Sequence, residues 1–452
     1  MTDTRSRMER ATPSTRKRLS RRECLGLAAG AVGPFLVLPK RALAGQKTLR
    51  IATWAHFVPR FNTWFDKMAE EWGRQHDTQV TVDRIPIQQI GERAKAEVRS
   101  GGGHDIVIFP WPPAEFQRHA IDHREIYDEL AFAYGSIPQI AHRSTFNPKT
   151  KRYFALADFF IPSPLHYFAD FWEEANMPLG PVHYGSLRSG GGRIRAKLGI
   201  PCGLALGPTL EGNVTTHTLF YAYRGQILDP EGEVAINRNA FTVDVLKYVK
   251  ALSQDAGTPE AFTWGPSGNA QAMLARKTSC TSHAISVART AEHDKPEVAR
   301  QIRLQPPLLG PYGVTAFPHV TNCPMVWNFA QNPGGAKEFL VSLIDSSKAG
   351  YESSRGCNFP TYPKTLPNLI VRLEKDAEAE PDDKYRHLKD ALHWTPNLGS
   401  PGYATPAWME VFNSSVLPRM FASFVRGDLS AADAARAAEA EVKRIAEKWK
   451  EV

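Results

Sequence analysis

The sequence predicts an α/β protein whose sheet is mainly parallel and is flanked by helices on both faces. Three short runs have the alternation and the β-branched content of strands, and they cover residues 47–54, 80–82 and 106–109. Between them, residues 61–72 and 90–98 repeat apolar side chains at intervals of three and four, which is typical of amphipathic helices. Strands that alternate with helices become parallel neighbours, and the pattern therefore predicts this fold class.

Each element follows from its own residues. Residues 47–54 read K-T-L-R-I-A-T-W, an alternating run that suits a strand. The first helix is predicted from a single apolar stripe, formed by Phe61, Trp64, Phe65, Met68, Ala69 and Trp72. The runs V-T-V and I-V-I-F give the second and third strands. Residues 101–103 are glycines that stand before a strand rather than between a strand and a helix, so they predict a loop and not a dinucleotide-binding turn.

Two other motifs are interpreted as structural. Residues 189–192 read S-G-G-G without the Lys-Ser/Thr of a phosphate-binding loop, and they are expected to form a flexible surface connection. His119 and His123 stand four apart on a predicted helix and could hold a metal, but no third ligand lies nearby in the sequence, so an exposed polar face is expected. No nucleophile elbow, zinc-protease motif or internal repeat is found.

Residues 1–44 are predicted to be a twin-arginine export signal. Arg21 and Arg22 precede a mild apolar core over residues 24–38, and Ala42-Leu43-Ala44 forms a signal-peptidase site. This core is shorter than the ~20 residues that span a bilayer, although a short membrane anchor is the alternative. The signal predicts export of the folded chain, cleavage after Ala44 and a periplasmic location.

Most of the net positive charge of the chain lies in this segment. The chain has 55 Lys+Arg and 47 Asp+Glu among its 452 residues; ten of the basic and three of the acidic residues lie in 1–44, which leaves 45 and 44. A nearly neutral remainder predicts no nucleic-acid surface. The 408 residues that follow are enough for two or more hydrophobic cores, and none of their apolar runs approaches the length of a membrane span.

Four cysteines follow the predicted signal: Cys202, Cys280, Cys323 and Cys357. An oxidising compartment allows disulfides in three possible pairings, and export in the folded state equally allows buried free thiols. No two of them have Cys-x-x-Cys spacing, so a cysteine metal site is not expected.

Aromatic residues follow two of the predicted parallel strands, at the sheet edge where such folds bind ligands. Trp54, His56 and Phe57 belong to the loop after the first strand, and Trp111 belongs to the loop after the third. Indole rings outside a core stack on flat apolar surfaces such as the C–H face of a sugar ring. The alternative is that these rings cover the end of their own sheet.

From residue 45 onward the chain resembles the extracellular solute-binding proteins of ABC importers, the family that includes maltose-binding protein. The matching segments occur in the order of that family: 48–54, 103–109, 151–157, 168–178, 200–207, 224–232, 268–282 and 427–445. The last of these resembles the closing amphipathic helix of the family. The chain departs from the family pattern at Ala157 and Asp158, at Asn176 and over residues 181–192, which concerns the hinge and the ligand rather than the architecture.

The resemblance implies two α/β lobes, each with a mainly parallel sheet, joined by crossing strands, with a ligand cleft between them. The first lobe is expected over residues 45–157 plus 303–331, and the second over 158–302 plus 332–452.

Twelve residues are expected to bind the ligand. Indoles would cover ring faces, while amides, acids and imidazoles would hydrogen-bond hydroxyl groups. The first lobe and the crossing contribute Trp54, His56, Phe57, Trp111 and Asp158; the second contributes Glu211 and Asn213 from a loop that follows a strand, with Trp264 and Ser286; late segments add Asn358, Tyr403 and Trp408. No catalytic residue, cofactor or metal ion is expected among them. Asp158 could accept hydrogen bonds from a neutral sugar or balance a cationic ligand.

The resemblance implies a monomeric periplasmic receptor that captures a small ligand, a sugar or polyol, and delivers it to the permease of an ABC transporter. The alternatives are an exported carbohydrate-active enzyme, a polyamine-binding receptor and a receptor that reports to a sensor kinase. A glycosidase needs two carboxylates ~5–5.5 Å or ~6.5–9.5 Å apart. Glu115, Asp158 and Glu211 are the acids placed near the cleft, and nothing in the sequence marks two of them as a pair.

Overall fold

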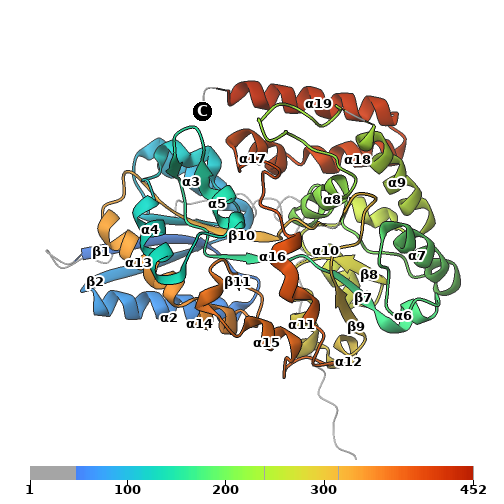
Figure 1. Cartoon of the computed structure of the whole chain (residues 1–452), viewed down its shortest axis with the longest axis horizontal. Helices are drawn as coiled ribbons and strands as arrows, with labels where there is room; N and C mark the ends of the chain where they lie inside the picture. Colours follow the sequence, from blue (N-terminus) through green and yellow to red (C-terminus); the bar gives the residue numbers. More distant parts are fainter. Residues whose placement is uncertain (1–46, 239, 314, 451–452) are drawn as a thin grey trace, which may run out of the picture. The chain divides into compact units, whose positions relative to one another are not determined.

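The computed structural model describes residues 47–238, 240–313 and 315–450, which carry a mixed α/β fold within one compact unit (Figure 1). The predicted export signal lies outside the described residues. None of the described helices is both long and apolar enough to cross a membrane.

The larger of the described sheets has six strands in the order β11-β6-β10-β3-β1-β2. β1 pairs in parallel with β2 along its whole length, from Lys47 opposite Thr78 to Trp54 opposite Ile85, and pairs in parallel with β3 on its other side. The other three pairings are antiparallel. The strands are β1 (Lys47–Trp54), β2 (Thr78–Ile85), β3 (Ile106–Phe109), β6 (Phe159–Ile161), β10 (Val320–Val326) and β11 (Phe359–Pro360).

The three predicted strands and two predicted helices between residues 47 and 109 are confirmed. α2 begins with a proline at its first turn and buries the predicted stripe through Phe61, Phe65 and Trp72. β2 is longer than the V-T-V run because it pairs with all eight residues of β1. The helices associated with this sheet are α2 (Pro59–Gln75), α3 (Ile90–Ser100), α4 (Arg124–Tyr134), α13 (Pro333–Asp345) and α14 (Ser347–Ser353).

The second sheet has β7 (Leu165–Phe168) between β8 (Cys280–Ser282) and β9 (Ile302–Gln305), and both pairings are antiparallel. The prediction of mainly parallel sheets is therefore wrong for this sheet, and the six-stranded sheet is mixed, with two parallel and three antiparallel pairings. The strand that was expected before Glu211 and Asn213 is absent: residues 200–206 form none, although the amide of Gly203 donates to the carbonyl of Cys280 at 2.8 Å. Pro201 has no N–H to extend a hydrogen-bonded ladder.

The glycines of residues 189–192 lie within a helix, so the prediction of a flexible connection there is wrong. α7 (Tyr184–Leu198) runs through all three glycines. A Cβ at Gly190 would lie 2.5 Å from the Trp172 ring, and one at Gly191 would lie 2.4 Å from Sγ of Cys202. The glycines therefore allow close packing of this helix, which outweighs their low helix propensity.

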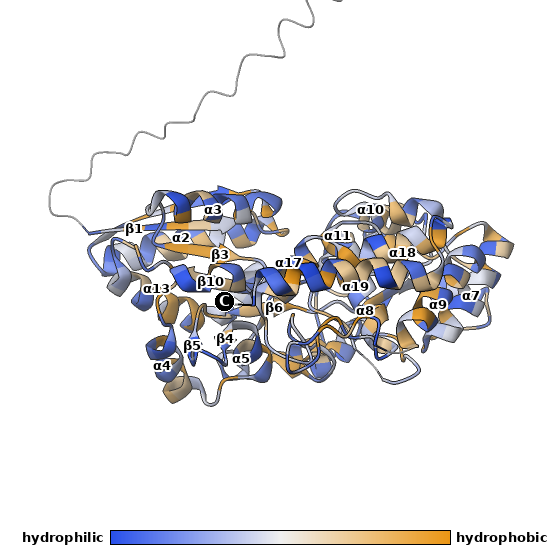
Figure 2. Cartoon of the chain, turned by 90° about the horizontal axis from the view of Figure 1, so that it is seen from above, coloured by the Kyte–Doolittle hydropathy of each residue, from blue (hydrophilic) through white to orange (hydrophobic). Residues whose placement is uncertain are grey.

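The helices that follow cover the second sheet and close the fold. The long last helix, α19, is amphipathic as the resemblance implied, burying Ala434, Ala438, Val442 and Ile445 against α17 and α18 (Figure 2). These helices are α6 (Ala169–Glu173), α8 (Leu210–Ala222), α9 (Phe241–Asp255), α10 (Gly268–Leu274), α11 (Ser286–Asp294), α12 (Pro296–Ala299), α17 (Pro406–Asn413), α18 (Val416–Arg426) and α19 (Ala431–Lys448).

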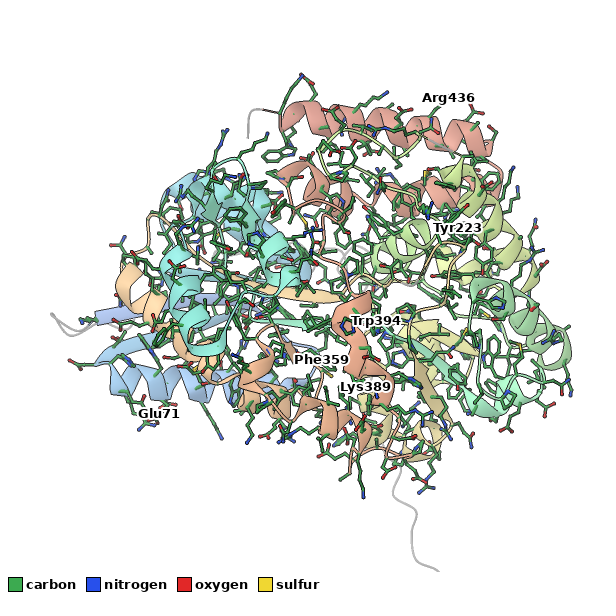
Figure 3. All side chains as sticks on the ribbon, in the orientation of Figure 1. Glu71, Tyr223, Phe359, Lys389, Trp394 and Arg436 are labelled. Carbon is green, nitrogen blue, oxygen red and sulfur yellow. The ribbon has the colours of Figure 1, made fainter. Side chains whose placement is uncertain are left out.

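Short elements complete the chain. They are the 3₁₀ helices η1 (Ile87–Gln89), η2 (Ala114–His119), η3 (Pro259–Phe262), η4 (Pro363–Thr365) and η5 (Arg386–Asp390), the strands β4 (Phe146–Asn147) and β5 (Arg152–Tyr153), and the helices α5 (Gln139–Thr145), α15 (Leu369–Glu374) and α16 (Ala391–Trp394). Near these late segments, Phe359 and Trp394 belong to one apolar cluster (Figure 3).

The exact residues at which the chain passes from one lobe to the other stay a prediction. β6, β11, α13 and α14, which the sequence assigned to the second lobe, pair with or contact elements of the six-stranded sheet. β9, most of which was assigned to the first lobe, belongs to the second sheet instead.

All four described cysteines are buried free thiols, and no disulfide occurs within residues 47–450 as described. The sequence left disulfides and buried free thiols open, and the structure shows buried free thiols.

Candidate functional site

A cavity of about 940 Å³ lies between loops and helices that adjoin the six-stranded sheet and helices from the later part of the chain. Its walls come from the loop after β1, from η1 and α3, and from the loop after β3 with η2. The opposite side is formed by the start of α8, residues 266–267, the turn between α17 and α18, and the end of α19. The volume lies within the range of ~300–1,000 Å³ that small-ligand sites occupy.

The start of α8 fixes two polar side chains at this cavity. Thr209 caps the helix, since its hydroxyl accepts the amide of Gly212 at 3.1 Å. A Cβ at position 212 would lie 1.8 Å from the carbonyl oxygen of Gly207, so only glycine permits this close turn. Glu211 and Asn213 flank that glycine and line the cavity. They lie in the first turn of a helix rather than on the predicted loop.

Both polar side chains retain hydrogen-bonding capacity. The amide of Ser267 donates to Oε1 of Glu211 at 3.2 Å, and Nδ2 of Asn213 donates to Oγ of Ser415 at 3.1 Å. In the part of the chain that the structure describes, Oε2 of Glu211 and Oδ1 of Asn213 have no hydrogen-bond partner. Buried acceptors of this kind are normally satisfied, so they suit a ligand that brings O–H donors.

Aromatic rings supply the apolar part of the wall. Trp111 is half-buried and packs against the core at the cavity edge, and Phe57 is 37% exposed. The cavity is also lined by Phe116, Phe412 and Trp449. Rings that are held by a core on one side and open on the other can stack on the faces of a sugar.

The charges around the cavity nearly balance. Lys95 pairs with Glu92 at 2.8 Å, and Lys448 pairs with Glu410 at 2.6 Å. Burial raises the pKa of Glu115 above its ordinary value, while the charge of Lys95 opposes that rise. The charged residues lining the cavity are Glu92, Glu115, Glu211, Glu410, Lys95, Arg99 and Lys448. A nearly neutral lining suits a neutral polar ligand better than a polycation.

The structure brings four of the twelve predicted residues together at this cavity: Phe57, Trp111, Glu211 and Asn213. The other eight do not line it.

Four of these eight belong to buried pairs close to the six-stranded sheet. Nε1 of Trp54 donates to Oδ1 of Asn322 at 2.7 Å, and Nδ2 of Asn322 donates to Oδ1 of Asp158 at 2.9 Å. Nε2 of His56 lies 2.9 Å from Oδ1 of Asn358. Burial raises the pKa of Asp158 to about 7 and lowers that of His56 to about 4. Trp54 and Asp158 are thus paired through hydrogen bonds to Asn322, and His56 and Asn358 through the contact between them.

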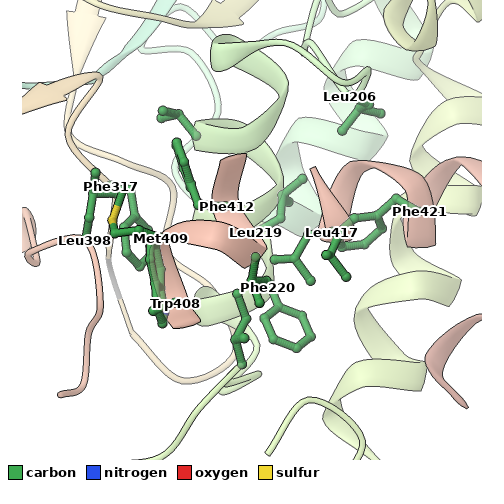
Figure 4. Close-up of a cluster of buried hydrophobic side chains, with 14 of the residues drawn as sticks. Leu206, Leu219, Phe220, Phe317, Leu398, Trp408, Met409, Phe412, Leu417 and Phe421 are labelled. Carbon is green, nitrogen blue, oxygen red and sulfur yellow. The ribbon is translucent and has the colours of Figure 1, made fainter. Parts of the chain in front are cut away.

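The remaining four lie elsewhere. Trp408 is fully buried and stacks on Phe412 and Phe317, in the apolar cluster drawn in Figure 4. Tyr403 lines a second cavity of about 750 Å³. Trp264 packs against the core, and its loop contributes Ser267 to the first cavity instead of its own ring; Ser286 opens α11.

The predictions for His119 and His123 are also corrected. The two residues do not share a helix, because η2 ends at His119 and α4 begins at Arg124. His123 is fully buried; its Nδ1 lies 3.2 Å from the carbonyl of Tyr153 and its Nε2 accepts the amide of Val326 at 3.1 Å. It is a core histidine and not part of an exposed face, whereas half-buried His119 lines the cavity.

Sequence reasoning missed the contribution of α3. Glu92, Lys95 and Arg99 all line the cavity, and their spacing of three and four places them along one edge of α3. This polar stripe was a usable signal. Nothing in the local sequence could have indicated Lys448 and Trp449, which reach the cavity from the end of the chain.

One group among the described residues has the arrangement of a metal site, although no metal was expected from the sequence. Glu211, His283 and His319 each offer one ligand atom, and these atoms lie within 4.8 Å of one another. The group adjoins the cavity through Glu211.

Comparisons with known proteins identify the fold. No family model matches the sequence, and no curated protein matches it. The chain resembles a sugar transporter of Arthrobacter chlorophenolicus A6 with bound laminaribiose, at 16% identity and a TM-score of 0.73, over 88% of this chain and 99% of that one. It also resembles maltose-bound MalE3 of T. maritima, at 16% identity and a TM-score of 0.72, over 88% of this chain and 99% of that one. A third structure is an ABC transporter solute-binding protein of Thermotoga lettingae TMO with α-D-tagatose, at 15% identity and a TM-score of 0.73, over 88% of this chain and 100% of that one. The chain therefore has the two-lobed fold of periplasmic binding proteins.

Proposed function

We propose that this protein is a periplasmic receptor that binds a sugar or polyol in the 940 Å³ cavity and delivers it to the permease of an ABC transporter. The observation that carries the proposal is the lining itself: aromatic rings and unsatisfied acceptors face one cavity from opposite sides. The structures of similar fold that hold laminaribiose, maltose and tagatose support this ligand class.

Such a receptor works because its ligand binds one arrangement of the two cavity walls more tightly than the others. A ligand that contacts Trp111 on one side and Glu211 with Asn213 on the other favours the arrangement in which both sides are in contact with it. The predicted export signal would place the protein in the periplasm.

A thermal-shift screen of the purified protein against mono- and disaccharides, polyols and polyamines tests the proposal. A ligand present at a hundred times its dissociation constant adds ~2.7 kcal/mol to stability, which a melting curve resolves readily. We expect a hit among the neutral sugars or polyols, confirmed by calorimetry at one site per chain. A hit restricted to polyamines would replace the ligand class.

Incubation of the best sugar hit with the protein separates a receptor from an enzyme. We expect the sugar to be recovered unchanged. A product that disappears in both Glu115→Gln and Glu211→Gln would identify a glycosidase, because such enzymes need two carboxyl groups on either side of the bond that breaks.

A further inference from the structure

We infer that Glu211, His283 and His319 bind a divalent transition metal ion, with zinc as the best match, where the two sheets connect. The inference does not require the sugar proposed above, although Glu211 lines the cavity as well as belonging to this trio. Its three side chains come from α8, from the residue after β8 and from the residue before β10.

The three side chains converge in the interior. Nε2 of His283 lies 3.9 Å from Oε1 of Glu211, and Nε2 of His319 lies 4.0 Å from the same oxygen. All three residues are at most 5% exposed. The two imidazole rings are 4.9 Å apart between centroids and tilted by 35°, so neither ring blocks the other.

These distances are too long for hydrogen bonds and close to those of a metal site. Zinc binds imidazole nitrogen and carboxylate oxygen at ~2.0–2.2 Å, so ligand atoms in a tetrahedral set lie about 3.4 Å apart. A contraction of roughly half an ångström would bring each histidine nitrogen to that distance from Oε1 of Glu211.

The polar atoms of the trio are left without partners by the protein itself. Within the described part of the chain, Oε2 of Glu211, Nε2 of His283 and both ring nitrogens of His319 make no hydrogen bond. A buried polar atom without a partner has lost its hydrogen bonds to water and gained none in return, which is unfavourable. A single cation between them would satisfy one atom of each side chain.

The tautomer of His283 is suited to metal binding. Its Nδ1 lies 3.3 Å from the carbonyl oxygen of Ala284, so this nitrogen carries the proton that it donates. Nε2 then keeps its lone pair and faces Glu211. A backbone acceptor on the far ring nitrogen is the usual partner of a metal-binding histidine.

The charge of the trio also matches a cation. Histidine binds a metal as a neutral imidazole and glutamate binds it as a carboxylate, so the trio would offer one negative charge to the ion. Two neutral imidazoles and one carboxylate form a donor set that favours zinc or another late divalent metal over Mg²⁺ or Ca²⁺.

The location suggests what the ion would do. The amide of His319 donates to the carbonyl of Ile161, and that of His283 to the carbonyl of Pro164. Residues 162–164 join β6 of the larger sheet to β7 of the smaller one. An ion held by His319 and His283 would therefore fasten the two sheets on either side of this connection, beneath the ring of Phe57, whose centroid lies 5.5 Å from that of His319.

The test uses protein purified without a polyhistidine tag, stripped with a chelator and titrated with Zn²⁺ by calorimetry. We expect one ion per chain and a higher melting temperature. Zinc-edge X-ray absorption of the loaded protein should show nitrogen and oxygen ligands at ~2.0–2.1 Å with imidazole scattering. Less than one ion per chain, or a spectrum without imidazole, would overturn the inference without affecting the sugar proposal.

Variants assign the ligands. His283→Gln and His319→Gln should each weaken Zn²⁺ binding by at least about 100-fold, because even indirect partners of a metal commonly contribute 10–100-fold. The matched control is His217→Gln, which removes a buried histidine on α8 that contacts Phe317, Trp408 and Phe412 and should still bind one ion. Circular dichroism of each metal-free variant checks folding. Folded His283 and His319 variants with unchanged affinity would place the ion elsewhere.

Discussion

Two tryptophans that the sequence treated alike lie in different surroundings. Trp111 lines the cavity, while Trp264 packs against the core outside it, although Ser267 from the same loop reaches the cavity. Indole content alone could not separate them, because both rings are half-buried. Their variants therefore form a matched pair.

We expect Trp111→Ala to weaken binding of the sugar identified in the screen by about thirtyfold. Loss of a buried aromatic anchor commonly costs ~2 kcal/mol or more of binding free energy. Trp264→Ala should lower the melting temperature and leave the affinity per folded molecule unchanged. Calorimetry and melting curves on both variants provide the measurement. An equal loss of affinity in Trp264→Ala would show that the two rings face the ligand together, as expected from the sequence.

Asp158 should make stability depend on pH. Burial raises its pKa to about 7, above the ordinary value of 3.8, so the folded state binds its proton more tightly than the unfolded state. The stability that this provides is complete below about pH 4 and is lost as pH rises toward 7, at up to ~1.4 kcal/mol per pH unit. In Asp158→Asn, which retains an oxygen for the donors Asn322 and Phe159, that loss should disappear.

Urea denaturation of both proteins at pH 4 to 7.5 measures this effect. The difference between the Asn variant and the wild-type protein isolates Asp158, since other titrating groups contribute to both. A difference that stays constant over this range would mean that Asp158 is ionised in the folded protein.

At the scale of elements, α7 shows that a glycine can be required within a helix by the side chains that pack against it. Gly191 leaves no room for a side chain beside Cys202, whereas a Cβ at Gly192 would meet its nearest atom, the carbonyl oxygen of Asp255, at an ordinary 3.5 Å. The two positions are adjacent on one helix and share its low propensity.

We therefore expect opposite effects from the same substitution. Gly191→Ala should destabilise the protein by about 1–3 kcal/mol through overpacking. Gly192→Ala should stabilise it by up to about 1 kcal/mol, because alanine loses less conformational freedom in a helix. Equilibrium unfolding of both variants decides this. Stabilisation by both would show that α7 shifts freely away from Cys202.

At the scale of the whole molecule, the cavity depends on segments that are far apart in the chain. α3, the start of α8 and the end of α19 each contribute to it. Truncation before Lys448 would therefore remove part of the wall without touching either sheet.

The export signal can be tested on the intact precursor. Replacing Arg21 and Arg22 with Lys should retain the protein in the cytoplasm in its uncleaved form, because the twin-arginine pair is the feature that this export route reads. Cell fractionation and the N-terminal sequence of the exported wild-type protein, expected to start at Gly45, provide the measurement. Normal export of the double variant would assign the chain to another route.

The sequence by itself determined the α/β class, the alternating elements between residues 47 and 109 and the closing helix. Strand and helix periodicities record which face of a local segment meets a core, and that information lies within a few consecutive residues. Only the tertiary structure decided which polar and aromatic residues share a cavity. Trp54 and Asp158 are buried because Asn322 pairs with both, α7 tolerates its glycines because Trp172 and Cys202 approach it, and Glu211 meets His283 and His319 only after the chain folds. Such contacts join residues up to a few hundred positions apart, and no local pattern encodes them.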